Sequence, residues 1–115
     1  MIYTMIKRFF ILLLAIVASV GMSYALTPRS GDTWDDNTKT LTVNSNPQDD
    51  RYHDQNEIKR LVISSSVTEI GEQAFSSSYN LESVFAYSGL QVIDQDAFFS
   101  CPKLESVILP SKWAL

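Results

Sequence analysis

A spacing of 23 residues recurs through the second half of the chain and constrains its fold more than any other feature. Apolar positions of the same type repeat at this spacing: Ile70, Ala74, Phe75, Leu81 and Val84 return as Ile93, Ala97, Phe98, Leu104 and Val107. A partial earlier copy, Ile58, Leu61 and Val67, stands 23 residues before Leu81, Val84 and Leu90. Such a period is typical of a solenoid, whose units bury their apolar faces against one another. We therefore expect a β-rich solenoid of about two repeats and a partial one.

Short β-prone runs occupy the same phase of each repeat, at 61–63, 84–86 and 107–109. Equal phase predicts that they lie side by side as parallel strands, and alternation along a strand sends every second side chain inward. A small residue before a ring, as in Ala74-Phe75, lets the returning segment approach the strands while the ring fills the interior. The predicted repeat core comprises Leu61, Ile63, Val67, Ile70, Ala74, Phe75, Leu81, Val84, Leu90, Ile93, Ala97, Phe98, Cys101, Leu104, Val107 and Leu109.

These residues resemble the leucine-rich repeats of BspA-like surface proteins, whose unit carries Ile-Gly-x-x-Ala-Phe and then Cys-x-x-Leu-x-x-Val. The chain shows this pattern at Ile70–Phe75, Ala97–Phe98 and Cys101–Pro110. Ser78 stands where the first unit would carry Cys, and Asp94 where the second would carry Gly. The resemblance implies a secreted or cell-surface leucine-rich-repeat protein engaged in binding or adhesion, and it implies no catalytic residues.

Residues 1–25 have the pattern of a secretory signal peptide. Lys7 and Arg8 precede a short apolar run from Phe9 to Val20, and Ser23-Tyr24-Ala25 places small residues at a cleavage site. The apolar run is short for a membrane-spanning helix. We expect cleavage near Ala25 and a secreted, cell-surface or periplasmic location, with membrane contact only during export.

Residues 26–57 are expected to hold a hairpin cap and a polar loop, before the repeats of 58–115. Thr33–Asp35 and Thr40–Val43 are β-prone and flank a turn-forming stretch, which predicts a hairpin covering the first repeat. The segment Asn44–Asn56 has almost no apolar residue apart from Tyr52, so we expect a loop there.

Charge and cysteine content narrow the classes of partner. The formal net charge is −4, and two of the basic residues lie in the predicted signal peptide, so the exported chain is more acidic still. A surface without basic patches argues against nucleic-acid binding. The single cysteine, Cys101, allows no intrachain disulfide, and we expect it to be a buried small side chain of the repeat.

The best candidate for a binding surface is the outward side of the predicted strands. Val62, Phe85 and Ile108 share one register position, and Tyr87 follows Phe85 on the same face. An exposed apolar column of this kind is an interaction surface. Alternatively, the column is ordinary sheet composition covered by the hairpin or by the Asn44–Asn56 loop.

Evidence for catalytic or metal chemistry is weak. His53 lies among carboxylates but lacks a second histidine or a calcium-loop spacing, so a solvated acidic loop is the simpler interpretation, with a weak calcium site as the alternative. The serine runs at 64–66 and 76–78 suit turns, and no G-x-S-x-G elbow occurs. Cys101 beside His53 would be a nucleophile only if the fold brought the two together. We expect no catalytic, metal or cofactor site.

The sequence therefore favours a non-catalytic module that binds protein or glycan at the cell surface through its strand face. Two alternatives remain open: a truncated fragment of a longer repeat protein, or an accessory piece of a secreted enzyme. The last strand is expected to leave an unpaired edge, which makes self-association through the open C-terminal end a further possibility.

Overall fold

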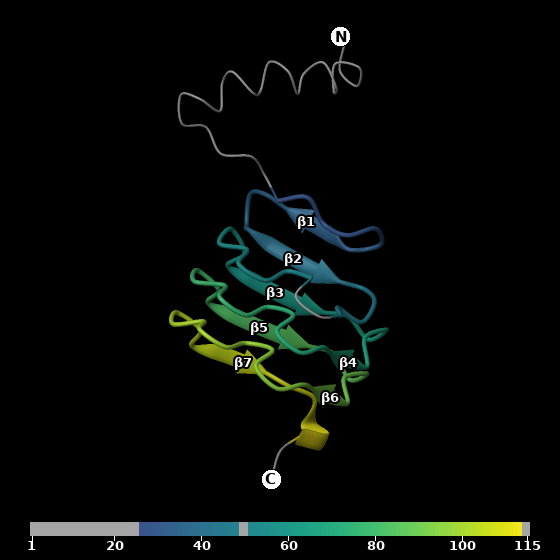
Figure 1. The fold of residues 1–115 in the computed structure, drawn as a ribbon. Coiled ribbons are helices and arrows are strands. Elements are labelled where there is room, and N and C mark those ends of the chain that lie inside the picture. Colours follow the sequence, from purple (N-terminus) through teal and green to yellow (C-terminus); the bar gives the residue numbers. More distant parts are fainter. Residues whose placement is uncertain (1–25, 49–50, 114–115) are drawn as a thin grey trace, which may run out of the picture.

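The computed structural model describes residues 26–48 and 51–113, so the predicted signal peptide lies outside the described residues. The strands form two sheets, and the larger one has the order β1-β2-β3-β5-β7. Its strands are β1 (Thr33–Asp35), β2 (Thr40–Val43), β3 (Arg60–Ile63), β5 (Ser83–Ala86) and β7 (Ser106–Ile108). A second sheet pairs β4 (Glu69–Ile70) with β6 (Val92–Ile93), and a 3-10 turn, η1, covers Ser111–Trp113. Figure 1 shows the strands of the larger sheet one below another.

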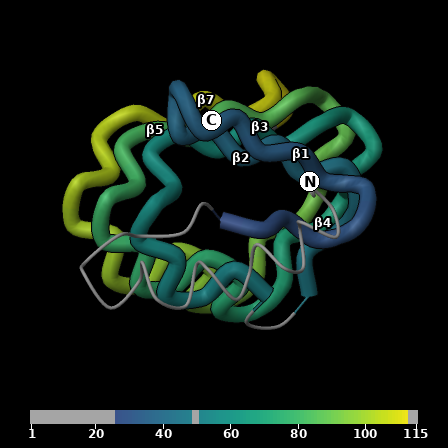
Figure 2. Tube along the Cα trace, turned by 90° about the horizontal axis from the view of Figure 1, so that it is seen from above, coloured from purple at the N-terminus to yellow at the C-terminus, as the bar shows by residue number. Residues whose placement is uncertain are grey.

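The 23-residue spacing is the register of the sheet. Leu61 pairs with Val84, and Val84 with Val107, in parallel strands. The smaller sheet keeps the same spacing, with Ile70 opposite Ile93. We use the word coil for the stretch of chain from one strand of the larger sheet to the next. Viewed along the stack, successive coils lie over one another (Figure 2).

The hairpin residues pair antiparallel, with Trp34 opposite Leu41. The second strand of this hairpin, β2, also pairs with β3 in parallel, with Leu41 opposite Leu61. The parallel ladder therefore begins one coil earlier than the sequence suggests, and the segment after β2 runs as the first coil rather than as a loop apart from the stack.

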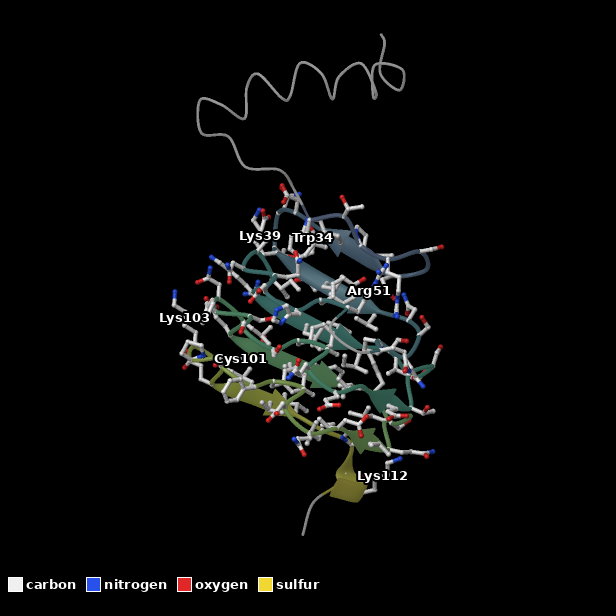
Figure 3. All side chains as sticks on the ribbon, viewed as in Figure 1. Trp34, Lys39, Arg51, Cys101, Lys103 and Lys112 are labelled. Atoms are coloured by element: carbon white, nitrogen blue, oxygen red, sulfur yellow. The ribbon has the colours of Figure 1, made fainter. Side chains whose placement is uncertain are left out.

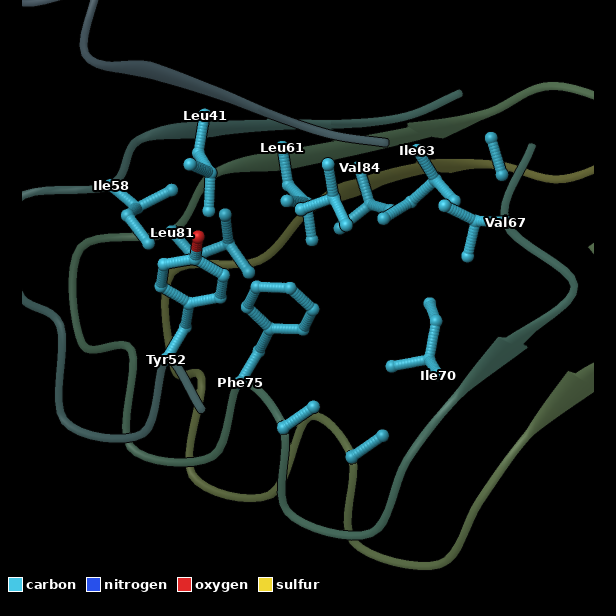
Figure 4. Close-up of a cluster of buried hydrophobic side chains, with 14 of the residues drawn as sticks. Leu41, Tyr52, Ile58, Leu61, Ile63, Val67, Ile70, Phe75, Leu81 and Val84 are labelled. Atoms are coloured by element: carbon cyan, nitrogen blue, oxygen red, sulfur yellow. The ribbon is translucent and has the colours of Figure 1, made fainter. Parts of the chain in front are cut away.

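Tyr52 ties this first coil to the next one. Its ring stacks on Phe75 with centroids 5.6 Å apart, and Phe75 stacks in the same way on Phe98 at 5.6 Å. The Tyr52 N–H donates to the Ala74 carbonyl at 2.9 Å, and the Phe75 N–H donates to the Ala97 carbonyl at 2.9 Å. Figure 4 shows Tyr52 beside Phe75. Tyr52 thus takes, in the first coil, the position that phenylalanine holds in the later ones.

Each coil turns at backbone positions with the same unusual geometry. Gln73 and Asp96, just before the alanine of each Ala-Phe pair, have φ of 58°. Asp54, Ser77 and Ser100, two residues after each stacked ring, have φ of 61°, 59° and 60°. Left-handed residues other than glycine are uncommon, and short polar side chains adopt this conformation most readily. The repeated φ values show that the coils share one backbone path around the ring.

Most of the expected core positions are buried, but the last coil departs from the expectation. Val107 is 51% exposed, whereas its counterpart Val84 is 2% exposed. Val84 lies between β3 and β7, but β7 is the outermost described strand and pairs only with β5. The placement of Val107 in the core was therefore wrong. For the same reason several other residues of the last coil are only partly buried: Ile93, Phe98, Cys101, Leu104 and Leu109.

A buried carboxylate holds the other end of the stack together. The Asp32 side chain is fully buried and accepts hydrogen bonds from Tyr52 Oη at 2.7 Å and from the Asn44 N–H at 2.8 Å. Arg29 Nε forms an ion pair with the same carboxylate at 3.0 Å, and the Arg29 N–H donates to Tyr52 Oη at 2.8 Å. Because both oxygens of the carboxylate accept hydrogen bonds, the buried charge is compensated, and the segment before β1 is fastened to the first coil.

Gly89 lies where two coil corners approach each other closely. A Cβ built on Gly89 would meet the Ser65 carbonyl oxygen at 2.1 Å and the Val67 carbonyl oxygen at 3.2 Å. Both contacts are to backbone, so Gly89→Ala is expected to lower the free energy of unfolding by about 1–3 kcal/mol. Chemical denaturation would measure this loss. Ser88→Ala, at an exposed neighbouring position, serves as the control and is expected to change stability by less than about 0.5 kcal/mol.

Tyr52 gives the stack a dependence on alkaline pH. Burial, helped by the Asp32 carboxylate, raises the pKa of Tyr52 to about 12 from its ordinary value of 10.0. The folded protein therefore keeps the Tyr52 proton at a pH where the unfolded chain loses it. The contribution of Tyr52 to the free energy of unfolding is fully present below pH 10 and is lost as the pH rises toward 12.

The variant Tyr52→Phe tests this dependence by urea unfolding at a series of pH values. It is expected to be less stable than wild type at pH 7 by about 1–3 kcal/mol, because Asp32 loses a buried donor. Its stability should also fall less steeply with alkaline pH. Equal alkaline slopes in the two proteins would contradict the assignment of the proton to Tyr52.

Candidate functional site

The candidate site is the outer strand face, which we define as Thr42, Val62, Phe85, Ile108 and Tyr87. The first four of these residues share one register position of β2, β3, β5 and β7. Exposure increases along this row, from a half-buried Val62 to Phe85 at 38% and Ile108 at 54%. On the opposite side of the same sheet, Leu61 of β3 and Val84 of β5 are buried.

Two aromatic rings stand at the centre of the outer strand face. Phe85 and Tyr87 meet edge to face, with centroids 4.9 Å apart and planes at 86°. Tyr87 is 51% exposed, and its N–H donates to the Ile63 carbonyl at 2.9 Å. That bond continues the parallel ladder past the end of β5, so it holds Tyr87 on the same face as Phe85. The pair presents both a ring face and a ring edge to solvent.

The polar segment of the first coil does not cover this face. Its backbone is bonded to the far side of the next coil, where the Asp54 N–H donates to the Ser76 carbonyl at 3.0 Å. Figure 4 shows Tyr52 and Phe75 rising from the side of the ring opposite the strands of Leu61 and Val84. Among residues 26–48 and 51–113 neither this segment nor the hairpin buries the rings, so the alternative of a covered column is wrong for the described residues.

A polar row borders the apolar one on the same face. Thr40, Arg60, Ser83 and Ser106 share the adjacent outward register position. The guanidinium of Arg60 donates through Nη1 to the Thr38 carbonyl at 3.1 Å. This bond holds the positively charged group near the turn before β2. A ligand on the outer strand face would therefore meet aromatic surface beside hydroxyl groups and one cation.

His53 makes two contacts that resemble catalytic geometry. Its Nε2 lies 2.9 Å from Asp54 Oδ2, and its Nδ1 lies 2.9 Å from Ser76 Oγ. If Nε2–H donates to the carboxylate, Nδ1 accepts from the serine hydroxyl. A nucleophilic serine must reach a substrate, yet Ser76 is 4% exposed. The contacts therefore link two coils and do not present a nucleophile.

No hydrogen bond joins Cys101 to His53 among the described residues. Cys101 is half-buried, and its Sγ donates to the Phe75 carbonyl at 3.4 Å. Burial raises the pKa of this thiol, so the reactive thiolate is disfavoured at neutral pH. Ser78, at the same position one coil earlier, likewise donates its hydroxyl to the Phe75 carbonyl, at 2.8 Å. Both residues cap the turn after the Phe75 ring.

The acidic loop of the sequence is only partly described, since Asp49 and Asp50 lie outside the described residues. Within the described residues no group of three or more His, Cys, Asp or Glu side chains is placed to hold a metal ion. One carboxyl pair, missed by the sequence analysis, joins adjacent coils: Glu69 shares a hydrogen bond with Asp94, beside a hollow lined by Glu72, Asp94 and Gln95. These residues do not share a repeat position, so the period gives no signal for them.

The carboxyl pair predicts a stability that increases on mild acidification. The hydrogen bond that protonated Glu69 donates to the Asp94 carboxylate, followed by repulsion between the two charges, raises the pKa of Glu69 above its ordinary value. Its stabilising contribution is present when Glu69 is protonated and is lost as the pH rises through its folded pKa.

Removing the charge tests this pair. Glu69→Gln is expected to raise the melting temperature at pH 7, because one amide replaces a repelled carboxylate. The melting temperature of this variant should also change less than that of wild type between pH 7 and pH 5. Thermal unfolding at both pH values measures the effect. Glu72→Gln, beside the pair, is the control, and equal shifts for both variants would contradict the assignment.

Comparison with known proteins identifies the repeat. Residues 42–114 match the family model described as the BspA type leucine rich repeat region (6 copies). No curated protein and no solved structure matches the chain. No helix within residues 26–48 and 51–113 is long and apolar enough to cross a membrane. Repeats of this family generally serve as non-catalytic binding modules in surface or secreted proteins. The matched region includes most of the first coil and spans well over half of the chain, which therefore belongs to the BspA-type leucine-rich-repeat family.

Proposed function

We propose that this protein is a secreted or cell-surface adhesion module that contacts protein or glycan through the outer strand face. The observation that carries the proposal is the exposure of Phe85, Tyr87 and Ile108 on the outer strand face, while Val84 and Ala86 on the inward side of β5 are buried. Solvent-exposed aromatic surface has a cost in water, and contiguous apolar patches mark interaction sites.

The stacking of the coils suits such a role. Backbone hydrogen bonds on both sides of β5 fix the spacing of its side chains, and Phe85 holds Tyr87 at 4.9 Å through their rings. A ligand would therefore find the two rings already ordered, so little side-chain entropy is lost on binding. Aromatic rings accept either apolar side chains of a protein or the C–H faces of a sugar, while the neighbouring hydroxyl row supplies hydrogen bonds.

The same proposal assigns a role to the N-terminal half. The predicted signal peptide directs export, and the β1–β2 hairpin acts as the cap of a solenoid. In support of the cap, β1 pairs only with β2, and its exposed residues, Thr33 and Asp35, are polar. A polar outer edge is what a terminal unit requires for solubility.

One observation favours a second candidate, in which the chain is a fragment of a longer repeat protein. Val107 and its partly buried neighbours form a surface that a further coil would cover. On this view the outer strand face would continue into that coil, and residues 26–115 alone would unfold at lower temperature than a version extended by one more repeat unit.

The aromatic pair provides the test of binding. Ligands are selected on immobilised wild-type protein from a random peptide display library and from an arrayed glycan set. The double variant Phe85→Ala, Tyr87→Ala is expected to bind the selected ligands at least about 30-fold more weakly, since the loss of even one aromatic hot spot costs about 2 kcal/mol or more. Biolayer interferometry measures the change.

A matched control separates the face from general stickiness. Tyr79→Ala, Val92→Ala removes two apolar side chains with 48% and 42% exposure that lie outside the outer strand face. This control should keep wild-type affinity and fold. Retained binding by the Phe85 and Tyr87 variant, with circular dichroism unchanged, would overturn the proposed site.

A further inference from the structure

At the β7 end of the stack, side chains that are buried in the earlier coils are exposed to solvent. Val107 is 51% exposed, but Val84, its neighbour in the ladder, is 2% exposed. Leu104 is only partly buried, whereas Leu81, one coil earlier, is fully buried. What buries Val84 and Leu81 is the next coil of the same repeat, so the surface at β7 has the shape and polarity to receive a coil like its own.

The backbone of β7 is also prepared for pairing. The Ser106 N–H donates to the Glu82 carbonyl at 3.3 Å, which directs it toward β5. Successive peptide groups along a strand point to opposite edges. The N–H and C=O of Val107 therefore point to the free edge. An edge with both groups directed outward is a template for another strand.

We propose that this edge binds a second copy of the chain, with the two β7 strands antiparallel around a two-fold axis at Val107. In this register the two Val107 residues exchange both backbone hydrogen bonds, and Ser106 lies opposite Ile108. An axis perpendicular to the sheet keeps both apolar interiors on the same side, so Val107 packs against Val107. The contact is self-complementary and closed, as a two-fold interface requires.

Charges permit this arrangement. The strand β7 contains no charged residue, and Glu105 would lie opposite Leu109, so no like charges meet between residues 105 and 109 of the two copies. Lys103, seen at this end of the molecule in Figure 3, is turned toward the preceding coil, where its Nζ donates to Asn80 Oδ1 at 3.0 Å. The cation is therefore occupied away from the free edge.

Head-to-tail stacking is disfavoured by the opposite end. There the edge strand β1 carries Asp35, and the adjoining turn carries the ion pair of Asp36 with Lys39 at 2.8 Å. Charged groups at a strand edge oppose pairing. Among the described residues, the apolar surface at β7 is matched by another β7 end rather than by the charged β1 end, which favours a dimer over a filament.

The dimer would join the outer strand faces of the two copies. Ile108 of one copy would lie beside Ser106 of the other, so the apolar and polar rows would continue across the axis with their order reversed. A single ligand could then contact both copies. The dimer itself depends on the β7 edge alone and stands or falls independently of the proposed binding role.

Sedimentation velocity of residues 26–115 over a wide range of concentration tests the proposal. Wild type is expected to change from monomer to dimer without larger species. Val107→Pro removes an N–H that only the second copy uses, and proline is tolerated at a free edge, so this variant should remain monomeric with an unchanged circular dichroism spectrum. Val107→Lys places two like charges at the axis and should also be monomeric. A wild type that stays monomeric, or folded variants that dimerise as wild type does, would overturn the proposal.

Cross-linking tests the register. Opposed residues in a hydrogen-bonded antiparallel pair have Cα atoms about 5.5 Å apart, within the range of a disulfide. In a background with Cys101→Ser, the variant Val107→Cys lies on the axis and should oxidise to a covalent dimer. Ile108→Cys in the same background lies opposite Ser106 and should cross-link much less. Equal cross-linking by both variants would refute the axis at Val107.

Discussion

Stacking of one coil on the next is the interaction on which the rest of the structure depends. The rings of Tyr52, Phe75 and Phe98 stack in order with centroids 5.6 Å apart. On the opposite side of the coils, the strands of the larger sheet pair in parallel, so each coil contacts the next through both its rings and its strands. No coil can bury its own apolar face, so each depends on a neighbour. The exposure of Val107 next to the burial of Val84 is the direct measure of that dependence.

The sequence predicts those parts of the fold where burial repeats at equal spacing. The strands around Leu61, Val84 and Val107 lie in parallel as the period indicates. The 23-residue spacing does not predict the first coil, because its corner after β2 is shorter than in the later coils. Leu41 pairs with Leu61 in the sheet but lies fewer than 23 residues before it in the sequence. Tyr52 was the available signal, since it stands one period before Phe75, but a single aromatic residue in a polar segment is weak evidence by itself.

For the candidate site, the sequence predicts on which side of the sheet each side chain lies, but not whether that side chain is exposed to solvent. Alternation along a strand correctly places Val62, Phe85 and Ile108 at one register position. Whether another segment covers them depends on the path of the first coil, and that path is fixed by tertiary hydrogen bonds such as Asp54 N–H to the Ser76 carbonyl. The carboxyl pair of Glu69 and Asp94 is beyond sequence reasoning for a different reason: the two residues meet across coils, at positions that the period does not relate.

Nearest-neighbour stacking also separates the two surfaces of this molecule. The outer strand face is formed by side chains that every coil supplies, so Phe85 and Tyr87 keep their places as long as β3 and β7 flank β5. Among the described strands of the larger sheet, the edges are β1, which carries Asp35, and β7, which contains no charged residue. A change at Val107 that removes an outward N–H leaves the bonds between β7 and β5 intact. A change at the β7 edge can therefore remove pairing while Phe85 and Tyr87 stay in place on the outer strand face.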